Sequence, residues 1–364
     1  MLSGSGVLGN VLYIRNGAEL TLTDTAGGGE ITGGKWQGIN VESGGSFSML
    51  GGEISACGRG LQIHGTAEMS GGAILNNTTN GGAVVYGSLT MTGGRLANNA
   101  CKYGSSGGVT VYGTFRMTGG SITNNTGGYG GGIYVETADG HLIMEGGSVT
   151  GNTGSDGGVS IGRSNASGSV AISGNAYITG NTSEAGAAAN LVINQDAYGD
   201  ITPVTMTGSF GGRFGVTIRP YGNDDPDLSV PFTAGLNGRS IAGFFSDNAA
   251  YIVRLNGDGE AHLVDSTILS TPDFCLPTGT LEIQSEAFAG IAAAVVYIPD
   301  GCGSIGAGAF RDCPNLRQVR IPAGCTIGEN AFAGVYELRI FGYRNSPAET
   351  YCNGRPDCVF IPLD

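Results

Sequence analysis

The most constraining feature of the sequence is a short motif that recurs along its first half: a methionine, one variable residue and a glycine pair. The copies begin at Met49, Met69, Met91, Met117, Met144 and, in shortened form, Ile172. The intervals between them are 20, 22, 26, 27 and 28 residues. A unit of this length cannot bury its own apolar side chains, so the motif predicts a protein built from stacked repeats.

Each repeat contains two further elements. An aliphatic residue after the glycine pair is followed three positions later by asparagine, as in Ile122 and Asn125, and Cys57 takes the asparagine position of one unit. A second glycine pair then leads a short apolar strand, as in residues 131–135. Three strand-like pieces per unit, without helical periodicity, predict a parallel β-helix. We expect methionines inside, asparagines bonding successive coils at one corner, and glycines at sharp bends.

Glycine and proline divide the chain. Of its 364 residues 69 are glycine, and 58 of these precede residue 271, whereas all 12 prolines follow residue 202. Proline lacks a backbone donor and is excluded from interior strands, so its absence from the first 202 residues fits a continuous hydrogen-bonded ladder. We therefore predict a β-helix over residues 1–200, end coils with a closing β-hairpin over 201–268, and a separate C-terminal domain over 269–364.

The repeated Gly-Gly and aliphatic-x-x-Asn elements resemble those of polymorphic outer-membrane proteins and related adhesins. The similarity covers residues 20–195 approximately. It implies a right-handed β-helix of the kind found in the passenger domains of those proteins.

A second repeat occupies the C-terminal part. Leu276-Pro, Ile298-Pro and Ile321-Pro recur at intervals of 22 and 23 residues, and each unit then supplies an Ala-Phe pair, whose phenylalanines are Phe288, Phe310 and Phe332. This pattern resembles BspA-type leucine-rich repeats of bacterial surface proteins over residues 272–364, with a terminal unit from Ser346 onward. We expect the phenylalanines to form an internal ladder and the residues before each aliphatic-Pro pair, Cys275, Tyr297 and Arg320, to face outward.

The sequence offers two candidate ligand-binding residues and two candidate cysteine pairs. We nominate Tyr297 and Arg320 as a possible ligand-binding surface, because exposed aromatic and arginine side chains make strong contacts. Cys302 and Cys325 occupy equivalent repeat positions, and Cys352 and Cys358 flank a turn. Either pair could form a disulfide in an oxidising compartment, although buried free cysteine is the more common state.

Charge excludes two classes of partner. The chain has 17 basic and 30 acidic residues, a formal net charge of −13, and only two lysines. A nucleic-acid or anionic-membrane binder needs a basic stripe, and none is visible. The longest apolar run, residues 291–298, is far shorter than the roughly 20 residues that span a bilayer, so we expect no membrane insertion.

The same composition bears on location. Low charge, scarce lysine and abundant Gly, Ser, Thr and Asn resemble bacterial surface proteins. Because no charged and then apolar leader opens the chain, we expect either an extracellular or cell-surface protein trimmed of its signal or, as the alternative, a cytosolic one.

Metal and catalytic chemistry have little support in the sequence. The three histidines share no repeat position, and no Cys-x-x-Cys pair occurs, so we expect no metal or cofactor. Calcium binding by two acidic loops remains an open alternative. The candidate ligands are Asp224, Asp225 and Asp227 in one loop and Asn256, Asp258 and Glu260 in the other. A solvated loop and a hairpin turn are the simpler interpretations.

The functional hypothesis is binding rather than catalysis. The BspA resemblance implies adhesion to host or matrix proteins or to glycans. The alternative is a β-helix polysaccharide lyase or glycoside hydrolase, which needs clustered carboxylates. The nearest such set is Glu136, Asp139, Asp156 and Arg163, and this alternative predicts that Asp156→Ala abolishes depolymerisation.

Overall fold

The computed structural model describes residues 2–3, 9–102, 104–136, 139–162, 168–222, 225–241, 243–265 and 273–363. The chain forms two compact units, Met1–Val264 and Asp265–Asp364. Both are built from short strands that pair in parallel with the strand one repeat later, as β12 does with β15 and β35 with β37. The predicted mostly-β architecture of a parallel β-helix followed by a leucine-rich-repeat solenoid is confirmed.

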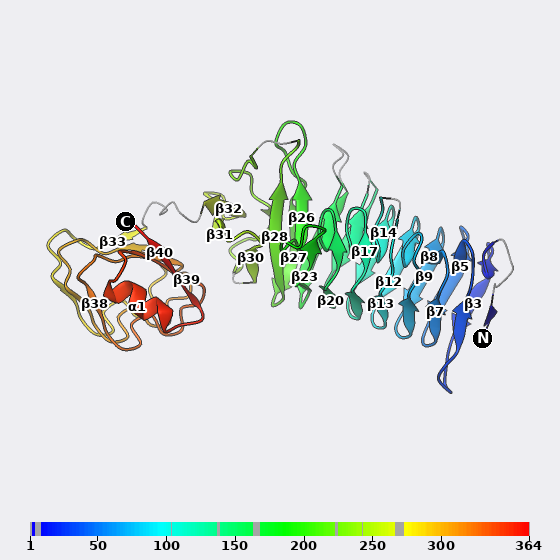
Figure 1. The fold of residues 1–364 in the computed structure, drawn as a ribbon, viewed down its shortest axis with the longest axis horizontal. Helices are drawn as coiled ribbons and strands as arrows, with labels where there is room; N and C mark the ends of the chain where they lie inside the picture. Colours follow the sequence, from blue (N-terminus) through cyan, green and yellow to red (C-terminus); the bar gives the residue numbers. More distant parts are fainter. Residues whose placement is uncertain are drawn as a thin grey trace. The chain divides into compact units, whose positions relative to one another are not determined.

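The first unit is a β-helix with three faces, along which successive coils stack (Figure 1). Face 1 consists of β3 (Glu19–Leu22), β6 (Ser46–Met49), β9 (Thr66–Met69), β12 (Ser88–Met91), β15 (Thr114–Met117), β19 (His141–Met144), β23 (Ser169–Gly174), β27 (Val204–Phe210) and β29 (Thr233–Ala234). Face 2 consists of β1 (Leu2–Ser3), β4 (Glu30–Thr32), β7 (Glu53–Ser55), β10 (Ala73–Leu75), β13 (Arg95–Ala97), β16 (Ser121–Thr123), β20 (Ser148–Thr150) and β24 (Tyr177–Thr179).

Face 3 consists of β2 (Leu12–Ile14), β5 (Gln37–Val41), β8 (Arg59–Ile63), β11 (Ala83–Val85), β14 (Val109–Val111), β18 (Ile133–Val135), β22 (Val159–Ile161), β26 (Leu191–Asn194), β28 (Arg213–Arg219) and β30 (Phe244–Ser246). Faces 2 and 3 join through β28, which pairs with β24 at its start and with β26 further on. A fourth, short ladder of β17 (Thr126–Gly127), β21 (Thr153–Gly154) and β25 (Thr182–Ser183) directly follows the asparagine positions of three coils.

The repeated methionines form one internal ladder on face 1, as predicted. Met69, Met91 and Met117 are in register and almost fully buried. The glycine pair after each methionine has a steric cause: a Cβ on Gly119 would lie 2.4 Å from the carbonyl oxygen of Thr92 in the previous coil. The second glycine, Gly120, has φ +82°, and a Cβ there would lie 2.6 Å from the terminal methyl group of Met91. Close stacking of the coils therefore requires both glycines.

The repeated asparagines form the second ladder. The Oδ1 atom of Asn125 accepts hydrogen bonds from the backbone N–H (2.9 Å) and Nδ2 (3.0 Å) of Asn99, and its own Nδ2 donates to Leu96 O (3.1 Å) and to Oδ1 of Asn152 (2.9 Å). The same pattern recurs in successive coils. The buried members are Asn77, Asn99, Asn125, Asn152, Asn181 and Asn190. Cys57 occupies the first place, as predicted, and its N–H donates to Asn77.

The ladder ends on a carboxylate that the repeat pattern does not reveal. Asp247 accepts hydrogen bonds from the backbone N–H and from Nδ2 of Asn190, both at 2.6 Å, and from the Thr217 hydroxyl at 2.9 Å. Each ladder asparagine donates a hydrogen bond to the next one along the chain, so the last asparagine, Asn190, needs an acceptor. A carboxylate, which only accepts, suits this position. Burial nevertheless raises the pKa of Asp247, although the hydrogen bonds from Asn190 and Thr217 act in the opposite direction.

The residue before each ladder position from Cys57 to Asn181 adopts a left-handed backbone conformation. Asn76, Asn98 and Asn124 have φ of 55–56°, and the corresponding residues of later coils are glycines. Asparagine and glycine tolerate this conformation best, which explains the Asn-Asn and Gly-Asn pairs of the repeat. The exception is Ala56, with φ 50°.

We expect Ala56→Gly to increase the free energy of unfolding by about 1 kcal/mol, because an L-residue with a Cβ is strained in this region. Urea unfolding followed by the fluorescence of Trp36, the single tryptophan of the sequence, measures stability in the first unit. Ala67→Gly on β9 is the matched control and should lower stability by roughly 0.5–1 kcal/mol. A loss of stability in Ala56→Gly would contradict the prediction.

The end of the first unit carries the predicted β-hairpin. β31 (Tyr251–Leu255) and β32 (Ala261–Asp265) pair as a two-stranded sheet across a turn in which the N–H of Asn256 donates to Glu260 O (2.8 Å). Ala261 and Leu263 are buried in the core of the β-helix, and the N–H of Phe232 donates to Ala261 O. The hairpin therefore covers apolar side chains of the last coils.

The second unit has two parallel ladders. One consists of β33 (Phe274–Cys275), β35 (Val295–Tyr297), β37 (Gln318–Arg320), β39 (Leu338–Gly342) and β40 (Cys358–Pro362), and the other of β34 (Glu282–Ile283), β36 (Ser304–Ile305) and β38 (Thr326–Ile327). Phe288, Phe310 and Phe332 stack inside with ring centroids 5.4 Å apart, as predicted. Tyr351 of the helix α1 (Pro347–Asn353) continues this row at 5.8 Å.

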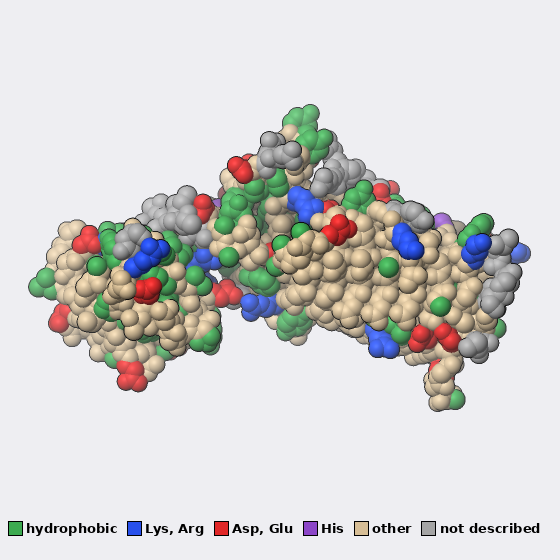
Figure 2. Space-filling model, in the orientation of Figure 1, with side chains coloured by type: hydrophobic (Ala, Val, Ile, Leu, Met, Phe, Trp, Pro, Cys, Tyr) green, Lys and Arg blue, Asp and Glu red, His purple; other side chains and the backbone are tan. Residues whose placement is uncertain are grey.

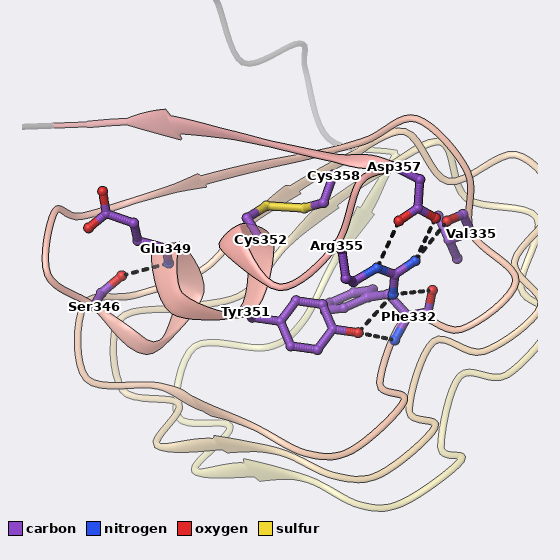
Figure 3. The surroundings of a disulfide bond; sticks show 9 residues. All are labelled: Phe332, Val335, Ser346, Glu349, Tyr351, Cys352, Arg355, Asp357 and Cys358. Carbon is purple, nitrogen blue, oxygen red and sulfur yellow. Dashed lines mark hydrogen bonds and ion pairs between the residues drawn. A yellow bond between two sulfur atoms is a disulfide. The ribbon is translucent and has the colours of Figure 1, made fainter.

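The helix α1 is part of a cap on the repeat stack (Figure 3). Ser346 caps its N-terminus by accepting a hydrogen bond from the N–H of Glu349, and a disulfide joins Cys352 to Cys358 on β40. Arg355 donates to Phe332 O (3.0 Å) and Val335 O (3.2 Å) and pairs with Asp357. Carbonyls at the end of the last repeat thus receive hydrogen bonds from the cap. Cys302 and Cys325 are both buried free thiols, and burial raises the pKa of Cys325 to about 12.

Replacing both Cys352 and Cys358 by serine is expected to destabilise the cap by about 2 kcal/mol, because the disulfide restricts the unfolded chain over this short loop. Hydrogen exchange of the amides in residues 346–362 should be faster in this variant. Amides of the β-helix serve as the internal control and should be unaffected. Equal protection of the cap in both proteins would count against a stabilising disulfide.

Candidate functional site

Tyr297 and Arg320, the two residues nominated from the sequence, lie next to each other on neighbouring strands. The Arg320 guanidinium carbon is 4.8 Å from the centre of the Tyr297 ring. Arg320 also pairs with Asp300 and donates to Ile298 O (3.0 Å) and to the Tyr343 hydroxyl (3.4 Å). Only 6% of Arg320 is exposed, and Tyr297 is half-buried. The prediction of an exposed arginine is therefore wrong, because the outward position is enclosed by these partners. Of the three outward positions, Cys275 is exposed.

Two carboxylates of the enzyme alternative, Asp156 and Glu136, are engaged by protein side chains. Asp156 is buried; it pairs with Arg219 and accepts a hydrogen bond from the Ser160 hydroxyl (3.2 Å). Burial lowers the pKa of Arg219. Glu136 is engaged by the Tyr112 hydroxyl, Asp139 is exposed on a loop, and Arg163 lies outside the described residues. Asp156 therefore has a structural role in this arrangement.

Two of the candidate calcium ligands, Asn256 and Glu260, make hydrogen bonds within the protein. Asn256 Oδ1 accepts from the N–H groups of Asp258 and Glu260, which closes the hairpin turn. The Glu260 carboxylate turns away to accept from Thr233 and from backbone N–H groups of residues 235 and 236. Asp225 and Asp227 lie on a loop, and Asp224 lies outside the described residues. No group of three or more metal-ligating side chains occurs in the described part of the chain.

A shallow groove of about 510 Å³ crosses the first coils on face 2. Glycines form its floor, Asp24, Glu30 and Glu53 lie in it, and Arg95 lines it three coils along from Glu30. The Asp24 carboxylate accepts from two backbone N–H groups of its own loop, and Glu30 accepts from the Ser55 hydroxyl. These two acidic groups therefore stabilise the local loop and strand.

A row of aromatic side chains lies on the outer surface of the β-helix, directly after three successive strands of face 3. The ring centroids of His64 and Tyr86 are 4.6 Å apart, and those of Tyr86 and Tyr112 are 4.8 Å apart, with nearly parallel planes. His64 and Tyr86 are exposed. Burial and the hydrogen bond to the Glu136 carboxylate raise the pKa of Tyr112, so its hydroxyl remains a donor.

Three polar side chains extend this row across face 3. Gln62 Oε1 accepts from Gln37 Nε2 (2.8 Å) and from Arg59 Nη1 (2.5 Å), and Gln62 Nε2 lies 2.9 Å from Nε2 of His64. We call these six connected residues the polar–aromatic patch: Gln37, Arg59, Gln62, His64, Tyr86 and Tyr112. The repeat pattern does not reveal this patch, but each of the three aromatic residues follows the last buried residue of its strand, and this shared position is the sequence signal for it.

No helix in the described residues is long and apolar enough to cross a membrane. Residues 267–350 match the model of the BspA type leucine rich repeat region, in six copies. A leucine rich cell surface protein from Faecalibacterium prausnitzii A2-165, known from a crystal structure, is 16% identical, with 65% of this chain and 76% of that one covered. The TM-score of this match is 0.17. No curated protein matches the chain.

The family match covers the units whose phenylalanine ladder and parallel strands are described above. The C-terminal unit of this protein is therefore a BspA-type leucine-rich-repeat region.

Proposed function

We propose that the protein is a non-catalytic adhesin of the bacterial cell surface that binds host or matrix proteins or glycans. The BspA-type repeat region is the observation that carries the proposal. The cap disulfide fits this location, because disulfides persist in oxidising compartments such as the cell exterior. The β-helix adds a long series of exposed coils whose rigid backbone can display binding side chains.

The binding hypothesis predicts saturable adhesion by the purified full chain. Surface plasmon resonance on immobilised matrix proteins, together with a glycan array, tests it directly. The heat-unfolded chain is the control for nonspecific adsorption. An absence of saturable binding to both kinds of target would contradict the proposed function.

The enzyme alternative is not favoured, because Asp156 is paired with Arg219 and Glu136 is engaged by the Tyr112 hydroxyl. It still makes a distinct prediction, namely shortening of polysaccharide chains. Incubation with a panel of polysaccharides, followed by size-exclusion analysis of the products, separates a lyase or hydrolase from a binding protein. A binding protein should retain glycans without cleaving them.

A further inference from the structure

The polar–aromatic patch begins on strands of face 3 whose outward central residues are accessible and continues at the ends of the next two strands. The outward side chains in the centre of later strands, such as Val84, Thr110 and Ser160, are almost completely buried. In the earlier coils the equivalent residues are Tyr13, which is 55% exposed, and the half-buried Asn40 and Gln62. The outward centre of face 3 is therefore accessible on β2, β5 and β8 and buried on β11 and β14, where the accessible patch residue is Tyr86 at the strand end.

An unpartnered acceptor lies beside the patch. Oδ1 of Asn40 is inaccessible to solvent and has no hydrogen-bond partner among the described residues. Asn40 is paired in register with Gln62 on the next strand. A buried acceptor without a partner costs about 1–3 kcal/mol, and a small shift of this amide toward a bound hydroxyl group would recover part of it.

The chemistry of the patch indicates a ligand with many hydroxyl groups. Glutamine amides both donate and accept, as sugar hydroxyls do, and phenol and imidazole edges add further donors and acceptors. The one cationic group, Arg59, is engaged by Gln62 and by Asn80 O (3.4 Å), so it is not free to select an anion. On the face seen in Figure 2, backbone and uncharged polar side chains make up most of the β-helix surface.

The size of the patch favours a small ligand over a protein. Its side chains come from four successive coils, which at about 4.8 Å per coil span roughly 14 Å. A stable protein partner buries about 800 Å² on each side, which is more than six side chains in a row provide. An oligosaccharide of a few units, lying along the coil axis, fits this dimension.

We propose that the polar–aromatic patch binds an uncharged oligosaccharide, with the Tyr86 edge and the Gln62 amide as its central contacts. This inference rests on the proposed function, since it assigns the glycan part of the adhesion to a site. It places recognition on the β-helix and leaves the leucine-rich-repeat unit free for other contacts.

The test uses the full chain and an array of neutral oligosaccharides, each printed beside a sialylated or sulfated counterpart. Hits are measured in solution by isothermal titration calorimetry at two salt concentrations. We expect binding to neutral members that changes little with salt, and a loss of at least about tenfold in affinity in Tyr86→Ala. Tyr177→Ala is the matched control, because Tyr177 is 44% exposed against 45% for Tyr86 but lies on face 2.

Gln62→Leu supplies a second test that keeps the aromatic row, and Trp36 fluorescence in urea confirms that each variant is folded. Binding of neutral glycans that is equal in wild type, Tyr86→Ala and Gln62→Leu would overturn the patch but leave the adhesin function intact. If the chain binds matrix proteins but no neutral glycan on the array, the proposed site is likewise overturned and the adhesin function is retained. No binding to any target would overturn both proposals, so the two failures are distinguishable.

Discussion

Asn125→Asp is expected to lower the free energy of unfolding of the β-helix by about 4 kcal/mol, although the two side chains have nearly the same shape. The aspartate could still accept the two hydrogen bonds from Asn99. Its second oxygen would face Leu96 O and Asn152 Oδ1, to which Asn125 donates in the native protein. Leu96 O would lose the donor from residue 125, Asn152 Oδ1 would keep only the backbone N–H of residue 125, and an unpaired charge would be enclosed beside both oxygens.

Asp247→Asn is the matched substitution at the end of the same ladder, and we expect a change of no more than about 1 kcal/mol. In the native protein Asp247 Oδ2 accepts from the Asn190 N–H and Oδ1 from Asn190 Nδ2. After a small rotation the single oxygen of an asparagine can accept both, as each ladder asparagine does for its neighbour, and its amide nitrogen can donate to the Thr217 hydroxyl. Urea unfolding of both variants, followed by Trp36 fluorescence, measures the difference. Equal destabilisation by the two substitutions would show that the direction of the amide ladder does not matter.

The pH dependence gives a second measurement on Asp247. Its pKa is raised in the folded protein mainly by burial, so the folded state binds this proton more tightly than the unfolded state does. Wild-type stability should therefore fall as pH rises from the unfolded pKa, about 3.9, through the folded one. Asp247→Asn lacks this contribution. Its stability relative to wild type should become more favourable over the same pH interval, and a difference that stays constant with pH would contradict the assignment.

The repeat architecture was predictable from sequence because it depends on periodic residues. The methionine, asparagine and phenylalanine ladders follow from identical residues at one repeat spacing, since stacked coils place equivalent positions side by side. Asp247 could not be identified in this way. It joins the ladder from a coil where the repeat has already changed, and its partner Asn190 follows Asn181 by only nine residues.

The candidate sites were less predictable, because burial of an outward position depends on partners outside the repeat. Arg320 occupies the predicted outward strand position, yet Asp300, Tyr343 and the Tyr297 ring enclose it. The helix α1 was also missed, although Ser346-Pro347 followed by Glu349 is a typical helix start. Its seven residues are too few for a periodic signal. The polar–aromatic patch as a whole could not be identified from the sequence, because its residues become neighbours only when the register of the stacked coils is known.

Asp156→Ala is expected to destabilise the β-helix by about 3 kcal/mol, and this result separates the structural role of Asp156 from the catalytic one. The substitution leaves the guanidinium of Arg219 without its carboxylate partner, while the other Arg219 nitrogen still donates to Ser155 O (2.6 Å). Removing one member of a buried pair costs about 3–5 kcal/mol, and Arg219 retains 26% side-chain exposure, so the lower end of this range applies.

A double-mutant cycle with Arg219→Met completes the test, because a structural ion pair and a catalytic acid predict different outcomes. If the pair is structural, Asp156→Ala combined with Arg219→Met should cost clearly less than the sum of the single substitutions, since no unpaired charge remains. Urea unfolding followed by Trp36 fluorescence gives the coupling energy. A catalytic acid would instead give a folded, stable Asp156→Ala protein that has lost depolymerisation. Because Asp156 is enclosed by Arg219 and Ser160 and not open to a polymer, we expect strong coupling and no change in polysaccharide length for either protein.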